Sequence, residues 1–241
     1  MLNALVIASA AVLAAVVSPA AIAEEVGQTV PLGWHEEGQP VLRFQKDAAR
    51  QRGWILTPTG VVVVDFKLRQ SIALVQLPEW IWAGEEYSCV PDLAVGPKGE
   101  ALVSSNVVPT LWRIDPVTLA VTRHEPVLDA DTTKDVGFTG LTYSAKQEAF
   151  FAVSEFGALW RIDPLFRRAQ KIPLSAPILK ACGVAIPATK SRFVSLCVSG
   201  PQGGWTINLA PDQRSGYVRS EPCRDSRGMN PRPSGFAVGS E

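Results

Sequence analysis

An internal repeat constrains the fold of this chain more than any other feature. The run WRIDP at residues 112–116 returns at residues 160–164, 48 positions later, and residues 93–100 align in the same way with residues 141–148. A period in the forties that is built from short strands is typical of a propeller blade rather than of a helical array. The repeat therefore predicts an all-β chain that folds as a β-propeller.

Taking the WRIDP strand as the third of each repeat divides the chain into four sets of four short strands. The predicted strands are 40–46, 54–58, 61–67 and 71–77; 92–95, 101–105, 110–115 and 120–124; 141–144, 149–154, 158–163 and 169–173; and 183–186, 193–199, 205–209 and 217–220. Four repeats predict a small propeller of four blades, each of four antiparallel strands. The alternatives are an open β-sandwich or a ring that a second chain closes.

The residues of the repeated motif fit structural roles. Trp112 and Ile114 alternate along a strand and so share one of its faces. Trp205 takes the place of the tryptophan in the fourth repeat. Asp115 and Asp163 end their strands before a proline, where a carboxylate can accept hydrogen bonds from turn amides. A motif that recurs in each blade is expected to do structural rather than catalytic work.

The two ends of the sequence differ from the repeats. Residues 1–23 are almost wholly apolar and end in Ala21-Ile22-Ala23, which predicts a cleavable signal peptide. The alternative is a retained membrane anchor. Residues 24–223 are the predicted propeller domain, and residues 224–241, rich in Gly, Ser, Pro and Arg, are expected to lack fixed structure. The chain is therefore expected in the periplasm or outside the cell, with no stable membrane insertion after cleavage.

Four cysteines in an exported chain predict two disulfides. If residues 184–187 and 193–198 form a hairpin that pairs Pro187 with Arg192, Cys182 lies directly opposite Cys197, within the reach of a disulfide. By elimination Cys89 then pairs with Cys223. The alternative is that the cysteines are buried, reduced thiols.

Composition excludes several function classes. Lys+Arg and Asp+Glu are equal at 23 each, so no overall field favours nucleic acid. Only His35 and His124 are present, which leaves little material for a Ser-His-Asp arrangement or a zinc site. Motifs for nucleotide or haem attachment are absent from the sequence.

Residues 91–100, followed by Leu102, Val103 and residues 111–115, resemble the repeat of extracytoplasmic lactonase-like propellers. That broad group includes the gluconolactonase and virginiamycin B lyase families and relatives with no known reaction. The resemblance implies a propeller, and in the enzymatic members, which usually have six or seven blades, a divalent cation held in the central channel by Glu, Asn and Asp. The residues that could stand in here are Asp92, Asn106 and Glu155.

The two longest links between blades make the best candidate surface. Residues 79–88 supply three aromatic and three acidic side chains, and residues 129–135 add three more carboxylates. In a propeller these links lie on the same face as the turn between second and third strands, so their side chains can converge. A partner-binding patch is expected from the following residues: Trp80, Trp82, Glu85, Glu86, Tyr87 and Phe156. A second interpretation is that Trp80 and Trp82 fold back as core.

A third interpretation of the same loops is a cation site. Oxygen ligands suit Ca²⁺ or another divalent ion, and the candidate ligands are Asp92, Asn106, Asp135 and Glu155. The leading hypothesis is nevertheless an exported, non-enzymatic propeller that needs no cofactor and binds a protein partner or subunit through its inter-blade loops, with no catalytic residue assigned. The alternative hypothesis is a small metal-dependent hydrolase or lyase of the lactonase-like group.

Overall fold

The computed structural model describes residues 29–30, 40–84, 89–130, 137–187, 194–201, 203–210, 212 and 214–220. Every regular element among these residues is a β-strand, and no helix long and apolar enough to cross a membrane occurs in this part of the chain. The predicted signal peptide and the predicted C-terminal tail, residues 1–23 and 224–241, lie outside the described residues.

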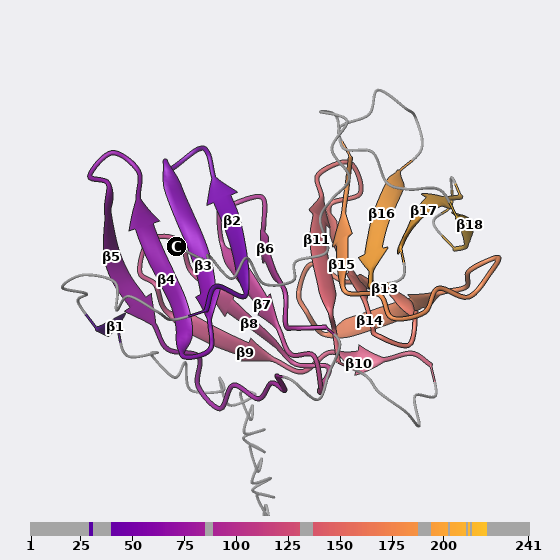
Figure 1. Cartoon of the computed structure of the whole chain (residues 1–241), viewed down its shortest axis with the longest axis horizontal. Helices are drawn as coiled ribbons and strands as arrows, with labels where there is room; N and C mark the ends of the chain where they lie inside the picture. Colours follow the sequence, from indigo (N-terminus) through magenta and orange to yellow (C-terminus); the bar gives the residue numbers. More distant parts are fainter. Residues whose placement is uncertain are drawn as a thin grey trace, which may run out of the picture.

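Four blades follow one another along the chain, each an antiparallel sheet of four strands in sequence order (Figure 1). Blade 1 is β2 (Arg43–Asp47), β3 (Arg52–Thr57), β4 (Gly60–Asp65) and β5 (Gln70–Val75). Blade 2 is β6 (Leu93–Val95), β7 (Ala101–Ser104), β8 (Leu111–Ile114) and β9 (Val121–His124). Blade 3 is β11 (Gly140–Ser144), β12 (Ala149–Val153), β13 (Leu159–Ile162) and β14 (Arg168–Ile172). Blade 4 is β15 (Gly183–Ala185), β16 (Ser195–Gly200), β17 (Gly203–Leu209) and β18 (Gly216–Arg219).

All sixteen predicted strands are present, and the predicted all-β, four-bladed propeller is confirmed. Two further strands of two residues each extend the outer edges of the blades. β1 (Thr29–Val30) pairs antiparallel with β5, and β10 (Val127–Leu128) pairs parallel with β14. Strands this short carry no periodic pattern, so sequence reasoning had no signal for them.

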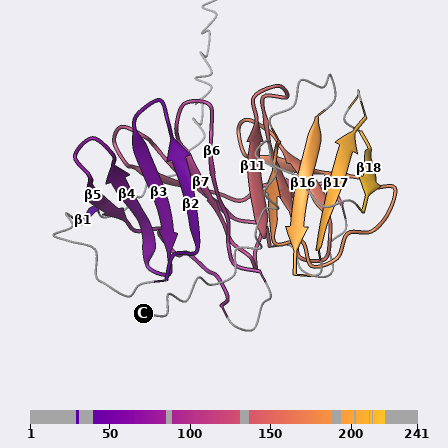
Figure 2. The same cartoon turned by 45° about the horizontal axis from the view of Figure 1, so that its top comes forward.

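Three apolar clusters join the blades in chain order. The first packs Trp54 of blade 1 against Trp112 of blade 2, the second packs Leu102 of blade 2 against Trp160 of blade 3, and the third joins blades 3 and 4. Figures 1 and 2 show blades 1 and 2 on one side of the molecule and blades 3 and 4 on the other, with β6 and β11 between them. In the described residues no fourth apolar cluster links blade 4 back to blade 1.

In blades 2, 3 and 4 the repeated tryptophan lies at the same place, against the preceding blade of the chain. Trp112 faces blade 1, Trp160 faces blade 2 and Trp205 packs against the cluster shared with blade 3. Blade 1 carries Val62 at the aligned position, opposite Ile55 of β3 as Trp112 is opposite Val103 of β7. The motif is therefore an inter-blade contact, which accounts for its loss in the first repeat.

The structure also explains why an aspartate recurs at the end of the third strand of blades 1, 2 and 3. Asp115 accepts hydrogen bonds from the Val117 and Thr118 amides, at 2.8 Å each, and these bonds hold the pKa of its carboxyl below the usual value. Asp163 accepts hydrogen bonds from the Leu165 and Arg168 amides, and in the first blade Asp65 accepts them from the Lys67 and Leu68 amides. The predicted structural role of these carboxylates is confirmed.

The predicted pairing of the cysteines is wrong. Cys182 is bonded to Cys89, with the Cα atoms 4.8 Å apart. The ladder between β15 and β16 places Ala185, and not Cys182, opposite Cys197, so the register differs by three residues from the one expected. Cys197 is itself disulfide-bonded, and the one cysteine of the sequence left for it is Cys223, which lies outside the described residues.

Candidate functional site

The innermost strand of each blade faces a common central space. β2, β6, β11 and β15 are the edge strands of their sheets, and they approach one another in chain order. One end of this space carries the links between blades and the turns between second and third strands, and we call it the loop end. The other end carries the turns between first and second strands, and we call it the turn end.

At the loop end, the carboxylate of Asp92 connects three blades. Its Oδ1 accepts hydrogen bonds from the Arg43 Nε at 2.9 Å and the Leu93 amide at 2.8 Å, and its Oδ2 accepts one from the Leu141 amide at 2.7 Å. Arg43 Nη2 donates to the carbonyl of Cys182 at 2.8 Å, which brings in the segment before β15. Burial raises the pKa of Asp92, while Arg43 and the two amides act in the opposite direction.

Asn106, at the turn between β7 and β8, organises the link between blades 1 and 2. Its Oδ1 accepts a hydrogen bond from the Ala83 amide at 3.0 Å, and its Nδ2 donates to the carbonyls of Ala83, at 2.7 Å, and Cys89, at 2.8 Å. The side chain is fully buried. Its amide therefore positions Cys89 for the disulfide to Cys182.

The predicted cation site is only partly covered by the described residues. Every side-chain oxygen of Asp92 and Asn106 already accepts a hydrogen bond, so these two residues do not fit the part of metal ligands as they stand. Glu155 is half-buried, and Asp135 lies outside the described residues. Among the described residues no group of three His, Cys, Asp or Glu side chains could hold a metal ion. The cation site stays a prediction.

Trp80 and Trp82 lie between the two predicted arrangements, an exposed binding patch and a buried core position. Trp80 and Trp82 stack with ring centroids 5.7 Å apart, and both are half-buried against the cluster between blades 1 and 2. Trp80 also donates from Nε1 to the carbonyl of Ser104 at 3.3 Å. They are thus neither fully core nor free surface. Ile81 between them is 51% exposed. Glu85, Glu86 and Tyr87 lie outside the described residues.

Phe156 forms a second exposed apolar group at the loop end, together with a residue that sequence reasoning missed. Phe156 is 66% exposed and Leu179 is 57% exposed. Their segments touch, because the amide of Ala181 donates to the carbonyl of Glu155 and Gly157 packs on the carbonyl of Ile178. We call the following set the apolar rim: Trp80, Ile81, Trp82, Phe156 and Leu179. The Cys89–Cys182 disulfide connects the two links that carry most of it.

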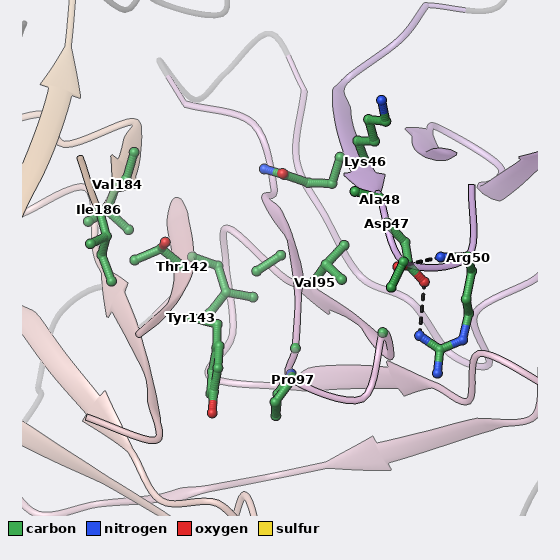
Figure 3. A pocket seen from close by; sticks show the side chains of 17 residues that line it. Lys46, Asp47, Ala48, Arg50, Val95, Pro97, Thr142, Tyr143, Val184 and Ile186 are labelled. Carbon is green, nitrogen blue, oxygen red and sulfur yellow. Dashed lines mark hydrogen bonds and ion pairs between the residues drawn. The ribbon is translucent and has the colours of Figure 1, made fainter. Parts of the chain in front are cut away.

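The turn end holds a cavity of about 480 Å³ that all four innermost strands line. Figure 3 shows Val184, Ile186 and Thr142 along one wall, Val95 across from them and Tyr143 beside Pro97. Asp47 accepts hydrogen bonds from the backbone amide and the guanidinium of Arg50 at the mouth. Burial, followed by the nearby carboxylates of Glu148 and Glu100, raises the pKa of the Tyr143 phenol, which therefore stays protonated. Sequence reasoning missed this cavity because its lining residues are ordinary strand and turn residues that form no recognisable motif.

No protein-family model matches the chain, and no curated protein is detectably similar to it in sequence. Solved structures do share its fold. An inactive variant of virginiamycin B lyase from Staphylococcus aureus, solved with quinupristin, is similar with a TM-score of 0.57 and 11% identity over 78% of this chain and 57% of that one. A second structure of virginiamycin B lyase from the same organism gives 0.51 and 12% over 72% and 52%.

The extracellular domain of a one-component system from B. thetaiotaomicron gives a TM-score of 0.51 at 11% identity, over 82% of this chain but 26% of that one. The chain thus spans less than two thirds of each of these proteins. At such identities the likeness concerns the fold alone. At that level it confirms the resemblance to virginiamycin B lyase-like propellers: this chain is a four-bladed β-propeller with the blade architecture of that group.

Proposed function

We propose that the chain is an exported, non-enzymatic propeller that binds a protein partner or subunit through the apolar rim at its loop end. The observation that carries this proposal is the exposure of Ile81, Phe156 and Leu179 at the same end of the molecule as half-buried Trp80 and Trp82. Aromatic and large aliphatic side chains that are held rigidly at a surface supply most of the binding energy at protein interfaces.

A buried amide side chain and a disulfide hold the apolar rim in place. Asn106 fixes the link that carries Trp82, and the disulfide fixes that link to the segment after Leu179. A preorganised surface loses less conformational entropy when a partner binds. Among the described residues of the loop end, the side chains of Asp92 and Asn106 are already engaged in hydrogen bonds that hold the blades and links together, which supports a binding role over catalysis.

Export is part of the proposal. A disulfide between two inter-blade links persists in an oxidising compartment, and two-electron reduction would break it in the cytoplasm. The predicted signal peptide at residues 1–23 supplies the route. Both features support the proposal that the protein acts in the periplasm or outside the cell.

The experiment compares capture of envelope proteins by the wild-type chain and by charged variants of the rim. Ile81→Asp and Phe156→Asp should each lower recovery of one defined partner at least tenfold, because a carboxylate would be desolvated in an apolar contact. Val117→Asp is the matched control, since Val117 is 78% exposed but lies in a turn at the opposite end. All three variants should melt within a few degrees of wild type. Equal recovery by the rim variants would refute the proposal.

The metal-dependent hydrolase or lyase remains the competing function. This function requires that Asp92 or Asn106 exchange its present hydrogen bonds for coordination of a cation. A thermal melt with EDTA and then with Ca²⁺ distinguishes the two functions, because a tightly bound native-state ion adds roughly 2 to 3 kcal/mol of stability. A rise of several degrees with one ion, lost in Glu155→Gln, would favour the enzyme.

A further inference from the structure

The cavity at the turn end is lined by consecutive residues of strands whose inner edges have no neighbouring strand. It includes Ala94 to Gly96 of blade 2, Leu141 to Tyr143 of blade 3 and Val184 to Ile186 of blade 4. A run of consecutive lining residues means that backbone as well as side chains faces the cavity. Among the described residues, no backbone hydrogen bond joins one of these innermost strands to another.

The direction of the free backbone groups follows from the ladder of blade 2. The Ser104 amide donates to the carbonyl of Asp92, and the Gly96 amide donates to the carbonyl of Glu100. The even-numbered residues of this strand therefore form the backbone hydrogen bonds to β7. The odd-numbered residues point the other way, as the bond from the Leu93 amide to the Asp92 carboxylate shows. Val95, two residues on, therefore directs its N–H and C=O into the central space.

The same reasoning applies to β11. The Leu141 amide donates to Oδ2 of Asp92 and not to β12, so the Tyr143 amide, two residues further, also points inward. At the loop end a carboxylate thus satisfies two strand-edge N–H groups, Leu93 and Leu141. At the turn end the corresponding groups of Val95 and Tyr143 line the cavity.

The side chains of the cavity complement an uncharged ligand that donates and accepts hydrogen bonds. The Gln45 amide and the hydroxyls of Thr142 and Tyr143 have no hydrogen-bond partner in the described part of the chain. The Asp47 carboxylate is paired with Arg50, and the Lys46 ammonium lies 5.5 Å from the Phe66 ring. The remaining walls, including Val95, Val184 and Ile186, are apolar and suit small aliphatic side chains (Figure 3).

We propose that the turn-end cavity binds an extended, uncharged peptide segment. Its carbonyls accept from the Val95 and Tyr143 amides, as the Asp92 carboxylate accepts from Leu93 and Leu141, and its N–H groups donate to the Val95 carbonyl. Addition of a strand to a free sheet edge is a general mode of peptide recognition, in which main-chain bonds give affinity and adjacent side-chain pockets give specificity. The cavity volume of about 480 Å³ falls in the range of ligand pockets and suits a short segment. This site lies at the other end of the molecule from the apolar rim and is independent of it.

The test uses the full chain, labelled at the valine and isoleucine methyl groups and titrated with a pool of capped tetrapeptides made from Gly, Ala, Ser, Thr and Val. We expect NMR shifts at Val95, Val184 and Ile186 but not at Ile81, saturating in the millimolar range. A pool of the same sequences with N-methylated backbones should bind at least tenfold more weakly, because it cannot donate to the strand edges.

Two variants separate the cavity from the surface around it. Ala185→Trp places a large ring on an exposed residue that lines the cavity and should abolish the shifts at Val95. Ala145→Trp makes the same change at an exposed residue of the adjacent turn, outside the lining, and should bind as wild type. The absence of any shift with the pool at 10 mM ligand, on the order of the weakest binding considered, would overturn the proposal. So would equal binding by the N-methylated pool or by Ala185→Trp.

Discussion

Arg43 and Asp92 form a buried ion pair, 2.9 Å between Nε and Oδ1, in which neither side chain is more than a tenth exposed. The pair joins β2 to β6, and its outer hydrogen bonds reach Leu141 and the carbonyl of Cys182. It therefore contacts blades 1, 2 and 3 and the segment that leads into blade 4. In the described residues it is also a direct contact between blade 1 and the segment that leads into blade 4, where no apolar cluster has formed.

The first prediction concerns this pair. Asp92→Ala leaves a buried guanidinium without its counter-charge and two amides without an acceptor, and should cost about 3 to 5 kcal/mol in the free energy of unfolding. Arg43→Met combined with Asp92→Ala should cost less than the sum of the two single changes, because no charge is then left unpaired. Urea unfolding of all four proteins measures the difference. Strict additivity would show that the pair does not act as a unit.

The strands of the fold could be predicted because each repeat has its own local signals. Alternating apolar residues give the strands, Gly and Pro mark the connections, and the recurrence of Trp112 as Trp160 sets the blade register. The face of the sheet that each tryptophan covers also follows from the alternation. None of these inferences depends on contacts between distant parts of the chain.

The cysteine pairing and the cavity could not be predicted, because both depend on how blades meet. Cys89 and Cys182 are 93 residues apart, and blades 2 and 3 lie between them in the sequence. The family resemblance predicted Asp92 as a metal ligand, but its hydrogen-bond partners Arg43 and Leu141 lie 49 residues away on either side in the sequence. A carboxylate that binds a metal and one that caps strand edges look alike in a sequence.

A second prediction compares Trp112 with Trp160, the aligned tryptophan of the next blade. Trp112 and Trp160 are equally buried at aligned positions, but Trp112 Nε1 donates to the carbonyl of Pro78 at 2.7 Å while Trp160 Nε1 has no partner among the described residues. Trp112→Phe should therefore destabilise the protein by about 1 kcal/mol more than Trp160→Phe. Denaturant melts of the two variants give the comparison, and an equal loss would mean that the hydrogen bond adds nothing.

A third prediction tests the disulfides. A peptide map of the unreduced protein should contain Cys89 linked to Cys182, and Cys197 linked to the remaining cysteine, Cys223. Replacing Cys89 and Cys182 together by serine should lower stability by about 4 to 5 kcal/mol, since the bridge closes a loop of 93 residues. Recovery of a peptide that links Cys182 to Cys197 would instead support the hairpin pairing inferred from sequence.

The last prediction is a pH dependence that originates at His124. Its ring lies 4.8 Å from Phe166, and its Nε2 is buried without a hydrogen-bond partner in the described part of the chain. Burial, reinforced by Arg113, lowers the pKa of His124 below its usual value of 6.5. The unfolded chain thus binds a proton here more readily than the folded one, and stability should fall as the pH drops through 6.5.

This effect can be isolated because the chain has only two histidines. The melting temperature of wild type should fall between pH 7.5 and pH 5, about one unit or more on either side of the ordinary histidine pKa, and the fall should be smaller in His124→Phe, which keeps an aromatic ring against Phe166. His35→Phe is the control and should retain the full wild-type fall. If His124→Phe and wild type lose the same number of degrees, the acid sensitivity of the fold comes from other groups, and the buried imidazole is not coupled to the packing of blades 2 and 3.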